Sequence, residues 1–96
     1  MKTVATAAQL TANELAAIRL CLNYNDRQSQ LEDNFSNGGQ KEFMQALKLN
    51  RHAAAQLCGS LEEKGMGTND HNEGNGHIFW LSKAAVNLIF DIIEKE

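Results

Sequence analysis

Residues 37–81 read NGGQKEFMQALKLNRHAAAQLCGSLEEKGMGTNDHNEGNGHIFWL, and the order of segments within this stretch decides the fold. A helix-sized segment runs from Gln40 to Lys48, and a second one ends at Lys64 and Gly65. Asn50 is a preferred N-cap residue, and Gly65 suits the left-handed residue that follows many helices. Only about two residues therefore separate the two helices, as in a helix-turn-helix unit.

Each of these helices has one apolar stripe at three-four spacing. The inward residues of the first are Phe43, Met44 and Leu47. The second should place four residues inward: Ala54, Leu57, Cys58 and Leu61. Six residues should lie on or near its outer face: Arg51, His52, Ala55, Gln56, Ser60 and Glu63.

A turn-rich segment follows the second helix. Residues 67–76 are dense in glycine and asparagine, whereas residues 77–81 have the aromatic and β-branched content of a strand. The pattern predicts a β-hairpin over residues 66–81 with Asp70 and Glu73 at its polar tip. Helix, short junction, helix and hairpin in this order predict a mainly α single domain with a β-hairpin, of the winged helix-turn-helix class, in which the hairpin is the wing.

The N-terminal part has one clear helix start. Thr11 and Glu14 form a capping box, so we expect a helix from about Ala12, after a tail of residues 1–10 that carries little pattern. Glu14 and Arg19 should lie toward water on this helix.

A polar connecting segment, residues 23–39, comes next. We expect Tyr24, Leu31 and Phe35 to pin it to the core, either as a long connection or as a short helix. Its length matters, because long loops often carry function.

Ser82 caps a final helix with an unusually wide apolar face, made of Ala85, Val86, Leu88, Ile89, Phe90, Ile92 and Ile93. So wide a face predicts either a helix at the centre of the core or one shared with a second subunit. In the second case the chain would form a homodimer through residues 83–95.

Composition and charge restrict the classes of function. The 96 residues suffice for one domain of residues 1–96 with a single core, and the formal net charge of −3 disfavours a protein whose main task is to grip phosphate. Cys21 and Cys58 lie among apolar neighbours without the paired spacing of a metal or redox motif, as in buried thiols of a cytoplasmic protein. No apolar run approaches the roughly 20 residues that a membrane span needs. We therefore expect a cytoplasmic protein without membrane attachment.

No catalytic, cofactor or metal site can be assembled from the sequence. A calcium loop that started at Asp70 would need glycine and glutamate where Asn75 and Leu81 stand. The three histidines do not reach metal-ligand spacing with either cysteine, and no glycine-rich loop follows a strand. We expect a protein that is not an enzyme and that binds no cofactor.

Two binding functions remain, of which the first is binding to double-stranded DNA. The chain is locally basic around the start of the second helix of the pair, where four residues could contact DNA: Lys48, Arg51, His52 and Gln56. Against this function, no lysine or arginine lies between Gly65 and Leu81, where a wing would meet phosphates.

The second function is binding to a protein or nucleoprotein complex with a basic surface. Five acidic residues would pair with lysines and arginines of the partner: Asp26, Glu32, Asp33, Asp70 and Glu73. The acidic balance of the chain makes this the preferred interpretation, with DNA-binding transcriptional regulation as the alternative.

Two parts of the sequence resemble known proteins. LCGSLEEKG at residues 57–65 and FWLS at residues 79–82 resemble the passage through recognition helix, wing and final helix in MarR-like winged-helix proteins. LNY at residues 22–24 and DNFSNGG at residues 33–39 are similar to segments of small proteins carried by bacteriophages and prophages.

The second resemblance implies action in the cytoplasm of a bacterial host. Small acidic phage proteins include inhibitors of bacterial defence, so it implies an inhibitor of a host macromolecular complex, of the anti-CRISPR kind that acts on type I surveillance complexes.

Overall fold

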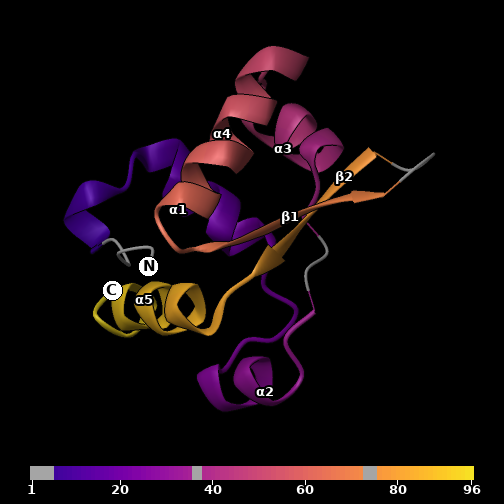
Figure 1. Ribbon diagram of the computed structural model, residues 1–96. Helices are drawn as coiled ribbons and strands as arrows, with labels where there is room; N and C mark the ends of the chain where they lie inside the picture. Colours follow the sequence, from indigo (N-terminus) through magenta and orange to yellow (C-terminus); the bar gives the residue numbers. More distant parts are fainter. Residues whose placement is uncertain (1–5, 36–37, 73–75) are drawn as a thin grey trace.

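The fold is mainly helical and contains one antiparallel hairpin (Figure 1). The computed structural model describes residues 6–35, 38–72 and 76–96, without the side chains at 71, 72, 76 and 77. Its elements in chain order are a 3₁₀ turn at Ala7–Gln9, α1 at Ala12–Leu20, α2 at Arg27–Glu32, α3 at Gln40–Leu47, α4 at Arg51–Glu63, β1 at Gly67–Asn72, β2 at Gly76–Leu81 and α5 at Lys83–Glu94. The predicted class is confirmed at this level: a mainly α fold with a β-hairpin.

Side-chain caps fix where four of the helices begin. The side chains of Thr11, Asp26, Asn50 and Ser82 each accept a hydrogen bond from the backbone N–H three residues further on. Three of these starts, at Thr11, Asn50 and Ser82, are those that the sequence predicts. A cap is a local interaction, so sequence alone can locate it.

Two left-handed residues end α3 and α4. Lys48 has a φ of 56° and Gly65 a φ of 78°, and the N–H of Leu49 bonds the carbonyl of Met44 at 3.0 Å. The turn at Lys48 lets α4 begin after only two further residues, which confirms the predicted short junction. Gly65 ends α4 as predicted.

The hairpin forms one side of the hydrophobic core. Its register pairs Gly67 with Leu81 and Asn69 with Phe79. On the far edge of β2, the N–H of Phe79 donates to the carbonyl of Gly38 at 3.0 Å. The ring of Phe79 meets that of Phe43 edge to face, with centroids 6.3 Å apart, and both rings are fully buried. Helix α3 is thereby packed against the sheet.

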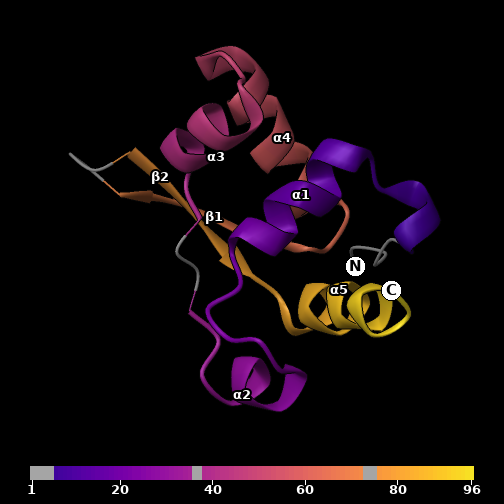
Figure 2. The ribbon, with the colours of Figure 1, turned by 180° about the vertical axis from the view of Figure 1, so that it is seen from behind.

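The helices are arranged around this hairpin in a fixed order. α1, α3 and α4 lie toward one end of the molecule and α2 at the other, with α5 between α1 and α2 (Figures 1 and 2). The described chain has a radius of gyration of 12.5 Å. Within the described residues, no helix is both long and apolar enough to cross a bilayer.

Strand β1 corrects one prediction. The sequence 67–72 has the composition of a turn, but these residues form a strand, and Asp70 pairs with Ile78 in mid-strand instead of lying at the tip. The residues of β1 have low β-propensity, and polar contacts with α4 stabilise the strand instead. The N–H of Asn69 donates to Glu62 at 2.8 Å, and its side-chain amide donates to the carbonyl of Cys58 at 3.0 Å, so α4 holds the strand in place.

Glu14 corrects a second prediction, because it lies inside the protein and not toward water. It is 2% exposed. Its carboxylate accepts hydrogen bonds from the ammonium of Lys64 at 2.7 Å and the hydroxyl of Ser60 at 2.6 Å. Ser60, predicted to lie on or near the outer face of its helix, is half-buried beside Glu14. These partners lie far along the chain, where local periodicity gives no information about them.

The segment 23–39 contains a short helix, α2, as one of the two predicted forms. Its main anchor is polar: fully buried Gln30 accepts from the backbone N–H groups of Asn23 at 2.8 Å and Tyr24 at 3.1 Å. Phe35 was expected to pin the segment, but it is 56% exposed. A buried amide replaces the expected aromatic contact.

Helix α2 is also tied to α5 by charge. The guanidinium of Arg27 contacts Asp91 at 2.6 Å and Glu94 at 2.9 Å. The wide apolar face of α5 is used within the chain: Ala85, Val86, Ile89 and Phe90 are buried, and Leu88, Ile92 and Ile93 pack partly buried against the core. This fits the first of the two predicted uses of the helix, and homodimerisation stays a prediction.

Candidate functional site

The end of the molecule formed by the α3–α4 junction gathers the four residues predicted to contact DNA. The left-handed turn at Lys48 and the Asn50 cap place Arg51 and His52 in the first turn of α4, and all these side chains are exposed. Gln56 is exposed on the next turn. The side-chain amide of Gln40 donates to the carbonyl of Arg51 at 3.0 Å, which holds the start of α4 against α3. We call Lys41, Lys48, Arg51, His52 and Gln56 the α3–α4 corner.

The positive charges of this corner are not neutralised within the described part of the chain. Arg19, Arg27 and Lys64 each form ion pairs. Lys41, Lys48 and Arg51 form none with any described residue. Their nearest acidic neighbour in sequence is Glu42, which is exposed on α3. The corner is therefore a locally positive surface on an acidic protein.

The exposed face of α4 is shallow beyond its first turn. Ala55 is exposed, and a Cβ added at Gly59 would meet nothing within 4 Å. Glycine in a helix costs roughly 1 kcal/mol relative to alanine, and no neighbouring atom in the structure requires it at this position. Small residues here allow a close approach by a partner to the helix backbone.

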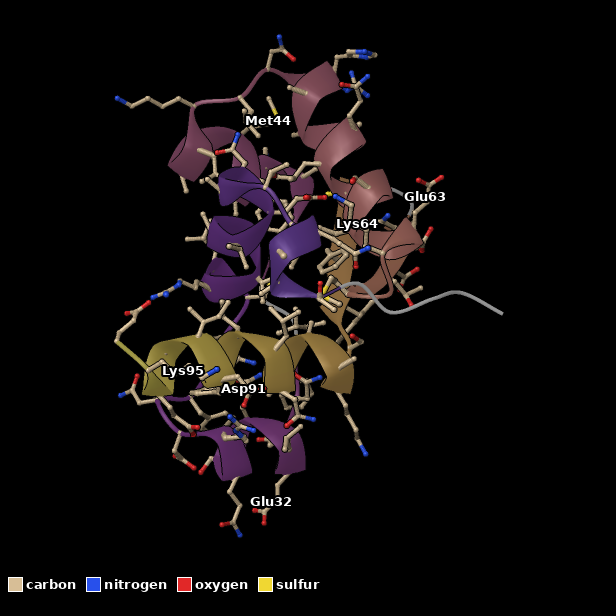
Figure 3. The ribbon with its side chains drawn as sticks, turned by 90° about the vertical axis from the view of Figure 1, so that its left-hand side faces the viewer. Glu32, Met44, Glu63, Lys64, Asp91 and Lys95 are labelled. Atoms are coloured by element: carbon tan, nitrogen blue, oxygen red, sulfur yellow. The ribbon has the colours of Figure 1, made fainter. Side chains whose placement is uncertain are left out.

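The residues predicted to bind a basic protein are not brought together. Asp26, Glu32 and Asp33 are exposed around α2, but Asp70 lies on the hairpin, which projects away from α2 (Figures 1 and 2). Glu73 lies outside the described residues. Glu32 on α2 and Met44 on α3 lie at opposite ends of the molecule (Figure 3).

The acids around α2 also have local partners. Asp26 caps the helix by accepting from the N–H of Ser29 at 2.8 Å, and this bond lowers the pKa of Asp26. The hydroxyl of Tyr24 donates to Asp33, and this bond raises the pKa of Tyr24. Glu32 accepts from Gln28 at 3.1 Å on the solvent side. Asp26 and Asp33 therefore stabilise the segment, which makes them less available to a partner.

The cysteines offer no activated nucleophile. Both thiols are buried, as the sequence predicts, and neither is in a disulfide. Burial raises the pKa of Cys58 to about 11, so its thiol stays protonated at neutral pH.

One hollow and the metal-ligating side chains within the described residues bear on whether a reaction centre is present. A shallow open hollow between α1 and α3 is lined by Leu20, Glu42, Gln45 and Ala46, with a single carboxylate among them. Among the described residues, no group of three histidine, cysteine or acidic side chains is placed to hold a metal ion.

One surface feature was not identified from the sequence. Trp80 is 39% exposed on the outer face of the hairpin, where its indole N–H contacts Asp70. The alternation of side chains along a strand could have indicated its exposure. With Phe79 and Leu81 pointing inward in β2, Ile78 and Trp80 must point outward.

Comparison of the chain with models of protein families, with curated proteins and with solved structures gave no match.

Proposed function

We propose that the protein is a non-enzymatic winged-helix protein that binds double-stranded DNA, with α3 and α4 as the helix-turn-helix and the β1–β2 hairpin as the wing. One observation carries this proposal: exposed Lys48, Arg51 and His52 stand at the start of α4 without an ion pair to any described residue. The first turns of a recognition helix are the part that reaches base edges in the major groove.

Each residue of the corner then has a distinct role. Arg51 and Gln56, about 1.4 turns apart on α4, are of the types that contact guanine and adenine edges. Lys48 and Lys41 would contact phosphates on either side of the groove, and the N-terminal end of α4 adds a favourable dipole. The small side chains of Ala55 and Gly59 let the helix lie close to the bases.

The net negative charge of the protein limits the expected affinity for DNA. With a net charge of −3 the protein gains little from counterion release outside the corner. The exposed carboxylate of Asp70 on the hairpin further weakens contact between the wing and phosphates. We therefore expect weak binding to arbitrary DNA and measurable binding to a preferred sequence at low salt.

Selection of bound duplexes from a randomised DNA library tests this function. Wild-type protein should enrich a sequence, and Arg51→Ala should weaken binding to it by about 1–3 kcal/mol. Lys83→Ala is the matched control, because Lys83 is an exposed lysine on α5, outside the corner. Failure to enrich any sequence, or equal effects of the two variants, would contradict the proposal.

A second candidate is inhibition of a host macromolecular complex by protein contact, and one observation favours it. Three exposed carboxylates lie at or beside the short helix α2, at the end opposite the corner: Asp26, Glu32 and Asp33. An anti-CRISPR protein acting on a type I surveillance complex is the specific form that the phage resemblance implies.

Affinity capture from bacterial lysate, with and without nuclease, separates the two functions. A defined protein complex that survives nuclease treatment supports inhibition, whereas nuclease-sensitive recovery of DNA supports the first proposal. Glu32→Lys is the cleanest test variant, because Glu32 caps no described helix and its carboxylate accepts a hydrogen bond from the Gln28 side chain one helical turn away on the exposed side. It should abolish capture of the complex if α2 is the contact surface.

A further inference from the structure

The outer face of the hairpin presents an aromatic ring beside a carboxylate. Register places Thr68 opposite Trp80 and Asp70 opposite Ile78, so these four side chains share the face that points away from Phe79 and the core. Thr68, Asp70 and Trp80 are exposed, and Ile78 is half-buried. We call these four residues the outer hairpin face.

Trp80 and Asp70 are held in a definite arrangement. The indole Nε1 of Trp80 donates to Oδ2 of Asp70 over 3.4 Å, diagonally across the two strands. This long contact keeps the edge of the indole near the carboxylate, so the ring lies across the hairpin. Both side chains are exposed, so a partner can approach the pair from solvent.

This pair selects a cation by two independent effects. The negative face of an indole attracts a cation positioned over it, and tryptophan does so best among the aromatic residues. A carboxylate at the edge of the ring adds a charge-assisted hydrogen bond to the same group. A phosphate at this position would be repelled by Asp70, so the chemistry of this face is opposite to that of the α3–α4 corner.

We propose that the outer hairpin face binds an arginine side chain of a partner protein, with the guanidinium stacked on Trp80 and bonded to Asp70. Arginine fits better than lysine because its planar group stacks on the ring while its N–H groups reach the carboxylate edge. The inference goes beyond DNA binding, because the outer hairpin face contains none of the residues of the α3–α4 corner that would contact base edges and phosphates.

The chain contains one tryptophan and one tyrosine, so emission excited at a wavelength that Tyr24 does not absorb reports on Trp80. The probe is a short arginine-containing peptide, and its control is the same peptide with citrulline, which has a similar shape but no charge. Titration of the full chain with the arginine peptide should change the Trp80 emission in a saturable way. The citrulline peptide should leave the emission unchanged.

Asp70→Asn is the decisive variant, because asparagine keeps a hydrogen-bond acceptor for the indole but removes the charge. It should weaken the response to the arginine peptide at least threefold while the circular dichroism spectrum of the folded protein stays unchanged. An equal response to both peptides, no response to the arginine peptide, or an unaffected Asp70→Asn variant would each overturn the proposal.

Arg51→Ala and a DNA duplex separate this inference from the proposed function. Arg51→Ala should leave the peptide response unchanged, because Arg51 begins α4 at the corner. A Trp80 response to the duplex that the arginine peptide competes away would assign the face to DNA and overturn the inference. Loss of DNA binding in Arg51→Ala alone would leave it intact.

Discussion

Glu14 and Lys64, fifty residues apart in sequence, form an ion pair of 2.7 Å that joins the start of α1 to the end of α4. The carboxylate also accepts from the N–H of Thr11 at 2.7 Å and the hydroxyl of Ser60 at 2.6 Å. The ammonium also donates to the carbonyl of Gln9 at 3.0 Å, so the turn before α1 is held by the same contact. A fully satisfied buried carboxylate thus fixes how α4 lies in the fold.

Removal of Lys64 should destabilise the protein markedly. Lys64→Ala leaves the 2%-exposed carboxylate of Glu14 without its cation, and breaking such a pair costs about 3 kcal/mol. Urea denaturation followed by circular dichroism measures the loss. Lys83→Ala, at an exposed lysine, should stay within about 0.5 kcal/mol of wild type. Equal stability of the two variants would show that the ion pair contributes nothing.

The same carboxylate should make stability depend on acid. Burial alone would raise the pKa of Glu14, but the hydrogen bonds from Lys64, Ser60 and Thr11 together outweigh burial and lower this pKa below its ordinary value of 4.5. The unfolded chain therefore binds this proton more readily than the folded chain does. The stabilisation is present above the ordinary pKa and is lost as pH falls through the lowered, folded-state pKa.

Glu14→Gln tests this dependence, because glutamine cannot titrate. The unfolding free energy of wild type should fall more steeply than that of Glu14→Gln below about pH 5. Asp26, whose pKa is also lowered, contributes to both proteins and cancels in the comparison. Parallel pH profiles would contradict the lowered pKa of Glu14.

Gln30 should hold α2 in place. Gln30→Ala leaves the N–H groups of Asn23 and Tyr24 without this acceptor and should cost about 2–3 kcal/mol. Hydrogen exchange should rise across α2, whereas DNA binding at the opposite end should persist under conditions where the variant remains folded. Gln28→Ala, on the exposed side of the same helix, is the control. Unchanged exchange in Gln30→Ala would contradict the anchoring role.

Cys58 should resist alkylation in the folded protein. Burial raises its pKa to about 11, so the reactive thiolate forms only near that pH and the sulfur is shielded from reagent. Mass spectrometry after treatment with iodoacetamide near neutral pH should find Cys58 unmodified, and modified once denaturant is added. Equal labelling in both conditions would show that Cys58 is accessible.

The parts of the fold that depend on local interactions could be predicted from the sequence. The Asn50 cap, the glycine end of α4 and the inward stripe of Phe43 all depend on residues within about one or two helical turns. A hairpin could be predicted, but the extension of its first strand through Asp70 to Asn72 could not, because the composition of this strand is that of a turn and its stability comes from β2 and from α4 contacts to Asn69. Long-range pairing overrides weak strand propensity.

The candidate site was also predictable only in part from the sequence. The corner residues at Lys48 and Arg51 follow from the helix junction, which the sequence predicts. The burial of Glu14 could not be predicted, because Ser60 and Lys64 lie at the end of α4, far along the chain. The burial of Gln30 could not be predicted either, because it depends on how the polar segment 23–39 folds back on itself. The dispersal of the acidic set likewise depends on where the chain places α2 relative to Asp70, which is a property of the whole fold.

The salt dependence of duplex binding tests the central claim most directly. Fluorescence anisotropy of a labelled duplex should be measured over a range of salt concentrations for wild type, Lys48→Ala and Lys83→Ala. If Lys48 contacts a phosphate, its removal should reduce the slope of log affinity against log salt by roughly one, whereas Lys83→Ala should leave the slope unchanged. Identical slopes for all three proteins, or no duplex binding by wild type at low salt, would contradict DNA binding through the α3–α4 corner.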